Sequence, residues 1–273
     1  MWPRLFSILV YVIVIYSFNT ASAQKKLVIM GSSTAAGAGA SPGNSWAAKI
    51  EAFYRQNMAD GLDTIVINLA LGGYTTYLEM PTGFIPPPNR PFPDPNANVT
   101  KALSYSPDVV IINLPTNDIV LGYTKIEYMD NLRLMFSTIN SAGARCFIAT
   151  TQPRNIGLAE RTALRELVDS INNNFAIRSI NFWSDLVSPL TDPANIYTIN
   201  PPVSAGDGIH INDLGHNYLF IRVRDKQIFA SNAPLPLFLK DFQAQQKNDF
   251  VIIKWSTEQE DPNTFFEIQR SRD

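Results

Sequence analysis

The chain has only two histidines, His210 and His216, and histidine is the usual proton acceptor in catalysis near neutral pH. His210 follows Asp207 by three residues on a predicted loop, and a tight turn of this length brings a carboxylate to the imidazole Nδ1. Nε2 is then left to accept a proton. By itself this pair is a weak signal, because an aspartate in a glycine turn near a histidine often arises by chance. For His216 we expect packing or hydrogen bonding at the last predicted helix.

A zinc site is a poorer interpretation of the same two residues. They stand six positions apart, with no cysteine or glutamate-rich partner nearby, and this does not match a common ligand spacing. We therefore expect no metal and no cofactor.

The candidate nucleophile lies in Gly31-Ser32-Ser33-Thr34, directly after an apolar run that reads as a buried strand. One interpretation is that these small residues form a turn and nothing more. The other is that one serine is a nucleophile at the carboxyl end of the strand, with open space above it. From the residues alone, Ser32 and Ser33 are both candidates.

Short apolar runs alternate with helical patterns over most of the chain, and this alternation predicts an α/β fold with a parallel sheet and helices on both faces. The apolar runs read as strands buried on both faces. The predicted strands are Lys26–Met30, Thr64–Leu69, Asp108–Asn113, Arg145–Thr150 and Arg178–Phe182. The predicted helices are Ser45–Asn57, Lys125–Ala142, Leu158–Asn174 and Asp213–Phe229.

Polar segments occur where such a sheet opens its ligand crevice, beyond the carboxyl ends of the strands. Acyl transfer needs a nucleophile, a base oriented by a carboxylate, and donors for the oxyanion, and these segments supply each of them. They are Gly31–Thr34, Asn68–Gly73, Pro115–Asp118 and Asp207–His210.

The order and spacing of these four blocks resemble the SGNH (GDSL-type) hydrolase family, which is named for a serine, a glycine, an asparagine and a histidine in separate blocks. The resemblance covers roughly Lys26 to Phe229. It implies a three-layer α/β/α, flavodoxin-like fold and ester hydrolysis without a metal.

The same resemblance implies a role for each block residue. Ser33 is the nucleophile, His210 the base and Asp207 the residue that orients it. The oxyanion hole uses the backbone N–H groups of Ser33 and Gly73 and the side-chain amide of Asn117.

Two positions depart from the family pattern. Ser32 stands where the family usually has aspartate, so that negative charge is missing beside the nucleophile. Pro115 stands where many members have glycine, which stiffens the loop before Asn117.

Other residues near the blocks have a substrate-binding and a structural interpretation. Tyr74 is a candidate wall of the substrate site, with core packing as the alternative. Arg154 is a candidate contact to an anionic or sugar substrate, with a solvated surface side chain as the alternative. We expect Asp118 to brace its loop. The proline-rich segment Phe84–Asn96 reads as a rigid surface loop that forms a wall of the site.

The first 23 residues read as a secretory signal peptide, with a positive Arg4, an apolar stretch and a small-residue cleavage site at Ala21–Ala23. An uncleaved anchor is the alternative. We expect the mature chain to start at Gln24 and to be secreted or carried on the cell surface, with the periplasm as another location. Residues 24–232 then form the hydrolase domain.

The helical periodicity of the sequence ends near Pro234. Strand-like runs follow at Leu235–Gln243, Asp249–Thr257 and Phe265–Arg270, with a hairpin turn near Asn248. Residues 233–273 resemble the opening strands of the fibronectin-like modules of type IX secretion cargo, which implies a secretion machinery as a partner and a chain that continues further. The alternative is that these strands pack back onto the first domain.

The net charge of −2 and the absence of a basic run argue against nucleic acid as a partner. We expect a secreted serine esterase acting on small-molecule or polysaccharide esters, with acetylated polysaccharide favoured over lipid. The alternatives are an acyltransferase that uses the same site and a non-catalytic carbohydrate-binding relative.

Overall fold

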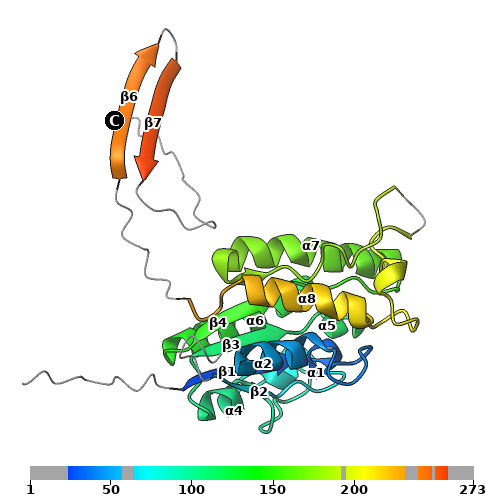
Figure 1. The fold of residues 1–273 in the computed structure, drawn as a ribbon. Coiled ribbons are helices and arrows are strands. Elements are labelled where there is room, and N and C mark those ends of the chain that lie inside the picture. Colours follow the sequence, from blue (N-terminus) through cyan, green and yellow to red (C-terminus); the bar gives the residue numbers. More distant parts are fainter. Residues whose placement is uncertain (1–23, 57–63, 192–194, 231–238, 248–249, 258–273) are drawn as a thin grey trace, which may run out of the picture. The chain divides into compact units, whose positions relative to one another are not determined.

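The structure is a computed structural model that describes residues 24–56, 64–191, 195–230, 239–247 and 250–257 (Figure 1). The chain divides into two compact units, one up to Ile228 and one from Phe229. The predicted signal peptide lies outside the described residues. Within the part of the chain that is described, no helix combines the length and hydropathy that crossing a membrane requires.

The first unit is built on a five-stranded, fully parallel sheet with strand order β2-β1-β3-β4-β5. The strands are β1 (Lys25–Gly31), β2 (Thr64–Asn68), β3 (Val109–Asn113), β4 (Arg145–Ala149) and β5 (Ser179–Ile180). Every residue of β3 is buried, as expected for a central strand of Val and Ile. The prediction that β2 is buried on both faces is wrong: β2 is an edge strand, and Ile65 is 39% exposed.

Helices cover both faces of the sheet, which confirms the predicted α/β fold. The helices are α1 (Ser33–Ala36), α2 (Trp46–Gln56), α3 (Thr76–Glu79), α4 (Val99–Ser104), α5 (Asn117–Val120), α6 (Lys125–Ser141), α7 (Leu158–Phe175) and α8 (Asp213–Asp225), with 3₁₀ turns at Ala176–Arg178 and Pro201–Val203. α4, α6 and α7 pack on one face, and α2 and α8 pack together on the other (Figure 1).

The two apolar layers draw on alternate residues of the same strands, as the period of a strand requires. Val28 and Met30 of β1 belong to the cluster under α6 and α7, together with Ile112 of β3. On the α2 side, the buried indole of Trp46 meets Phe182 edge to face, with ring centroids 5.4 Å apart.

Two predicted elements are shorter in the structure. The Thr150 hydroxyl accepts the N–H of Phe182, and Oδ1 of Asn181 accepts the N–H groups of Trp183 and Ser184. These side-chain bonds turn the chain, so β5 keeps only two residues. The last helix ends at Asp225 rather than Phe229, because Gln227 adopts φ +49°, which a right-handed helix does not allow.

The second unit contains an antiparallel pair, β6 (Leu239–Lys247) and β7 (Phe250–Thr257). β7 matches its predicted range closely, whereas β6 lies four residues later than predicted. The third predicted strand, Phe265–Arg270, lies outside the described residues.

Candidate active site

Gly31 makes the sharp exit from β1 that presents the serine pair. A Cβ on Gly31 would lie 2.4 Å from the carbonyl oxygen of Asn113 on the neighbouring strand, so no side chain fits there. The next N–H, from Ser32, donates to that same carbonyl at 3.0 Å. Ser32 is thereby buried in the turn, with 1% of its surface exposed, and Ser33 is the first residue of α1.

Ser33, and not Ser32, faces the histidine. The Oγ of Ser33 lies 2.9 Å from Nε2 of His210, and Nδ1 of His210 lies 2.6 Å from Oδ2 of Asp207. The carboxylate fixes the proton on Nδ1, which leaves the Nε2 lone pair directed at the serine hydroxyl. This chain of contacts is the one that activates a serine as a nucleophile.

Asp207 is held ionised by backbone donors. Its Oδ1 accepts the N–H groups of His210 and Ile209, each at 2.8 Å, so that Oδ2 remains for the imidazole. The His210 amide, the Ile209 amide and the imidazole together hold the pKa of Asp207 at about 2, against a smaller opposing effect of burial. The carboxylate therefore stays charged at any pH where an esterase would work.

The loop that carries His210 is fixed from both sides. Ile211 bridges to Ser204, and the His210 carbonyl accepts the N–H of Ala205. On the opposite side Gly39, with φ +90°, packs so closely that a Cβ there would lie 2.8 Å from the Cβ of His210 and 2.2 Å from the Ile211 carbonyl oxygen. The loop after α1 thus sets the position of the histidine relative to the serine.

Two backbone N–H groups, from Ser33 itself and from Gly73 in the loop after β2, are without a hydrogen-bond partner among the described residues. Gly73 has φ +82°, a conformation that favours glycine, and Gly72 beside it would place a Cβ 4.0 Å from that of Ser33. Two unpaired N–H groups next to a nucleophile suit a developing oxyanion.

The amide of Asn117 stands at the start of α5 and links the loop after β3 to the loop after β2. Its Nδ2 donates to the backbone carbonyl of Tyr74 at 2.9 Å, which leaves its second hydrogen unused. Its Oδ1 accepts from Nη1 of Arg154 at 3.3 Å. The amide is therefore oriented at both ends.

Arg154 is not a solvated surface side chain, so that alternative is wrong. Its Nη1 donates to the Thr116 hydroxyl at 3.1 Å as well as to Asn117, and its side chain is partly buried. Burial lowers the pKa of the guanidinium, and the negative charge of Asp207 acts in the opposite direction. Loop packing after β4 draws the arginine inward, and Arg154 braces the two residues that begin α5.

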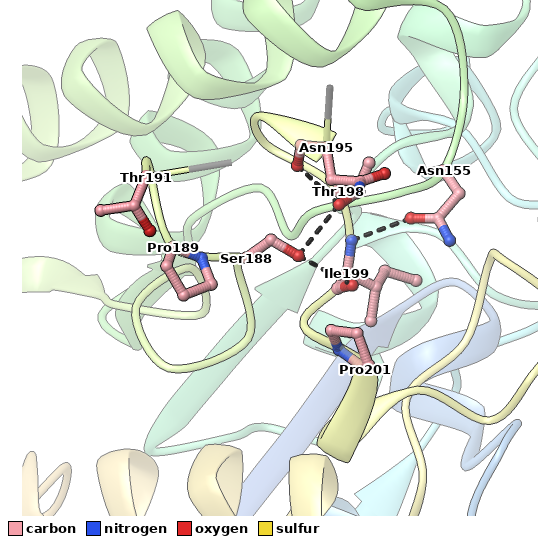
Figure 2. Close-up of a pocket in the computed structure, with 8 residues that line it drawn as sticks. All are labelled: Asn155, Ser188, Pro189, Thr191, Asn195, Thr198, Ile199 and Pro201. Carbon is pink, nitrogen blue, oxygen red and sulfur yellow. Dashed lines mark hydrogen bonds between the residues drawn. The ribbon is translucent and has the colours of Figure 1, made fainter. Parts of the chain in front are cut away.

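A cavity of about 500 Å³ lies next to the loop that carries Asp207 and His210, and Figure 2 shows residues that line this cavity. Its walls come from the loop after β4, through Asn155, and from the segment after β5. The N–H of Asn155 donates to the carbonyl of Gly208, which stands between Asp207 and His210. Sequence reasoning did not identify this cavity, since no motif marks it.

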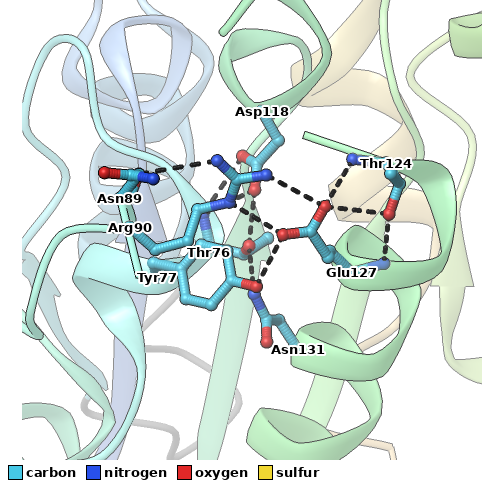
Figure 3. Close-up of polar contacts among 8 residues, drawn as sticks. All are labelled: Thr76, Tyr77, Asn89, Arg90, Asp118, Thr124, Glu127 and Asn131. Carbon is cyan, nitrogen blue, oxygen red and sulfur yellow. Dashed lines mark hydrogen bonds and ion pairs between the residues drawn. The ribbon is translucent and has the colours of Figure 1, made fainter. Parts of the chain in front are cut away.

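The proline-rich segment is tied down by a polar network (Figure 3). Arg90 forms an ion pair with Glu127 of α6 at 2.7 Å and lies over the ring of Tyr123. Glu127 also accepts from the Tyr77 hydroxyl at 3.0 Å and from the backbone N–H of Thr124. Arg90 and these donors lower the pKa of Glu127 to about 2.

Tyr74 connects that segment to the site. Its hydroxyl donates to Asp94, its ring packs against the core, and its carbonyl accepts from Asn117. Burial and this carboxylate raise the pKa of the phenol. The hydroxyl and the backbone carbonyl of Tyr74 are therefore both held by hydrogen bonds.

Two buried carboxyl groups lie in the short helices that follow β2 and β3, Glu79 in α3 and Asp118 in α5. Asp118 is 1% exposed and accepts from the N–H and hydroxyl of Thr76, which also receives a bond from Asn131 (Figure 3). Burial raises the pKa of Asp118 to about 7. Glu79 is fully buried without a side-chain hydrogen bond among the described residues, and burial raises its pKa well above the usual value. Asp118 thus joins the loop after β3 to α3, the bracing interaction expected of it.

His216 lies outside the site. Its Nδ1 accepts the N–H of Trp46 at 3.2 Å, and its Nε2 donates to the carbonyl of Ala38 at 3.1 Å. It is fully buried, and burial lowers its pKa. This neutral histidine joins α8 to α2 and to the loop after α1.

A parallel α/β sheet with a Ser–His–Asp contact at its carboxyl edge has the architecture of a hydrolase that acts through a serine. The sequence profile of the GDSL-like lipase/acylhydrolase family matches residues 29–218, and the chain belongs to this family. It is an SGNH-type hydrolase. No curated protein sequence matches the chain.

Solved structures share the fold at low sequence identity. An esterase, EstA, from Pseudoalteromonas, with bound monoethylphosphonate, is 17% identical, with 74% of this chain and 96% of that chain covered and a TM-score of 0.51. A GDSL-like lipase from Bacteroides thetaiotaomicron is 17% identical, with 74% and 86% covered and a TM-score of 0.52. A two-domain esterase active on acetylated mannans is 16% identical, with 83% and 58% covered and a TM-score of 0.50.

Proposed function

We propose that this chain is a serine esterase in which Ser33, His210 and Asp207 form the catalytic triad. The observation that carries the proposal is the unbroken set of contacts from Ser33 Oγ through the imidazole to the Asp207 carboxylate, at 2.9 and 2.6 Å.

The reaction begins when Ser33 Oγ attacks the ester carbonyl carbon and His210 Nε2 takes the hydroxyl proton. Negative charge then develops on the carbonyl oxygen, and the free N–H groups of Ser33 and Gly73 stabilise it, with the unused hydrogen of Asn117 Nδ2 as a third donor. Asp207 stabilises the imidazolium.

Collapse of this intermediate breaks the bond to the alcohol oxygen, and His210 returns the proton to that oxygen as the alcohol leaves. Water then attacks the acyl-enzyme with His210 again as base. The acid is released and the Ser33 hydroxyl is restored, so atoms and protons balance without a further reactant.

For the substrate we propose an acetylated polysaccharide, handled by an enzyme that is secreted or held at the cell surface. Support comes from the amino-terminal signal-like sequence and from the fold shared with an esterase active on acetylated mannans. The β-rich segment after residue 232, with β6 and β7, is proposed to begin an appended module of the type found in type IX secretion cargo.

Ester hydrolysis by purified protein tests the proposal. Wild type should release p-nitrophenol from p-nitrophenyl acetate, and Ser33→Ala should lose on the order of 10⁴-fold or more in rate. Ser32→Ala serves as the matched control, because Ser32 is buried in the same turn and the hydrogen bond to His210 comes from Ser33. Equal activity of wild type and Ser33→Ala would overturn the proposal.

A further inference from the structure

The cavity beside the triad loop has the size of a small-molecule site, at about 500 Å³. Its walls follow β4 and β5, so it lies along the same carboxyl edge of the sheet as Ser33. It is distinct from the residues assigned to catalysis, none of which lines it.

The cavity walls are held in place by their own hydrogen bonds (Figure 2). Asn155 Oδ1 accepts the N–H of Ile199 at 2.9 Å, and the Ser188 hydroxyl donates to the Ile199 carbonyl at 3.2 Å. The Thr198 hydroxyl donates to Ser188 at 3.0 Å. Polar side chains that are already bonded to each other give the cavity a fixed shape.

Two polar groups at this cavity have no partner among the described residues: Nδ2 of Asn155 and the hydroxyl of Thr191. The bond from Ile199 fixes which end of the Asn155 amide is oxygen, so both hydrogens of Nδ2 are free to donate. A methyl group placed on Gly208 would lie 3.7 Å from that nitrogen. Nδ2 of Asn155, a residue that lines the cavity, therefore lies close to Gly208 in the loop between Asp207 and His210.

Among the described residues, the lining carries no charged side chain, and its polar members are Asn, Ser and Thr beside Pro and Ile. An anionic ligand would find no cation here. An acyl chain would leave the free amide donors unpaired, which costs binding energy. A neutral ligand rich in hydroxyl oxygens satisfies those donors and covers the apolar rim.

We propose that this cavity is a subsite for a neutral sugar unit on the alcohol side of the ester, reached past Asn155 from the triad. This inference rests on the proposed esterase function and narrows its substrate. It assigns Asn155 to substrate binding and the cavity to alcohol specificity.

Asn155→Asp is the sharpest variant, because it keeps an oxygen for the Ile199 N–H and replaces the free donors with an acceptor. We expect KM for acetylated mannotriose to rise on the order of tenfold, a clearly larger change than any change in kcat/KM for p-nitrophenyl acetate. Thr191→Val, which removes one hydroxyl at the rim without changing shape, should raise KM for the oligosaccharide by a smaller factor. Unacetylated mannotriose should inhibit wild type competitively, and Asn155→Asp should weaken that inhibition.

Three results would overturn the subsite. Equal losses on both substrates would mean that Asn155 acts only through the triad loop. Unchanged kinetics on both substrates would mean that the cavity binds neither the sugar nor the acyl group of the ester. A changed preference between p-nitrophenyl acetate and octanoate would place the acyl chain there instead. In each case p-nitrophenyl acetate is still hydrolysed by wild type, whereas failure of the esterase function itself would abolish that hydrolysis.

Discussion

Nη1 of Arg154 lies 3.3 Å from Oδ1 of Asn117, and this contact decides which end of the asparagine amide is oxygen and which is nitrogen. A guanidinium can only donate, so the atom it meets must be the oxygen. Nδ2 then donates to the Tyr74 carbonyl at 2.9 Å and keeps a second hydrogen for the proposed oxyanion. In the proposed mechanism, Arg154 is accordingly a positioning residue for the Asn117 amide.

Arg154→Ala should lower kcat about tenfold with little change in KM for p-nitrophenyl acetate. The loss is smaller than the 10² to 10³ expected for removing an oxyanion donor outright, because Asn117 remains present but less well oriented. Arg165→Ala, which breaks only an exposed ion pair with Asp169, provides the control and should leave kcat unchanged. A rise in KM with kcat intact would instead assign Arg154 to direct substrate contact.

Gly39 and Gly43 allow a matched test of the loop that positions His210. Both have positive φ, +90° and +78°, so alanine is strained at either position by roughly 1–2 kcal/mol. Only at Gly39 would the new methyl group collide with His210 and Ile211; at Gly43 it meets nothing within 4 Å.

We therefore expect both alanine variants to lose some stability in thermal unfolding, and Gly39→Ala alone to lose at least tenfold in kcat. Similar kcat values for the two variants would show that the loop after α1 does not set the histidine position.

Asp118 should make folding stability depend on pH. Burial raises its pKa from the usual 3.8 to about 7, against the opposing bonds from Thr76, and the negative charge of Glu127 acts in the same direction as burial. Between those pH values the folded chain keeps the proton that the unfolded chain releases, so this group makes the free energy of unfolding fall as pH rises.

Asp118→Asn removes that titration while keeping an oxygen for the Thr76 N–H. In urea unfolding, the stability of Asp118→Asn relative to wild type should improve from pH 4 to pH 7 by up to about 1.4 kcal/mol for each pH unit. Asp130→Asn, at an exposed position on α6, provides the control for removing one aspartate from the surface. Parallel pH curves for wild type and Asp118→Asn would contradict the assignment.

The central strands were predictable because the stretch Val109–Ile112 of β3 contains only Val and Ile, which favour burial on both faces. The exposure and length of the edge strands were not predictable. The exposure of Ile65 depends on β2 having a neighbour on one side only. The short length of β5 depends on side-chain hydrogen bonds made by Thr150 and Asn181. These are properties of the assembled sheet rather than of any local pattern.

The blocks of the site were recognisable as motifs, and the structure brings Ser33, His210 and Asp207 together, while their catalytic roles stay predictions. The supporting residues were not recognisable. Nothing local marks Arg154 as inward-facing or Asn155 as a cavity wall, since both are placed by loop packing after β4. Gly39 offered a faint signal as one of several glycines after the serine, but its contact with His210 joins segments far apart in the chain.

The most direct test of the central claim is to locate the covalent intermediate. Wild type would be treated with diethyl p-nitrophenyl phosphate, which forms a stable phosphoryl ester on an activated serine, and the modified peptide would be sequenced by mass spectrometry. We predict one phosphoryl group per chain, on Ser33, with loss of esterase activity in proportion to labelling, and no labelling of His210→Ala. A label on Ser32 or on any other residue, or full loss of activity without a label on Ser33, would contradict the account.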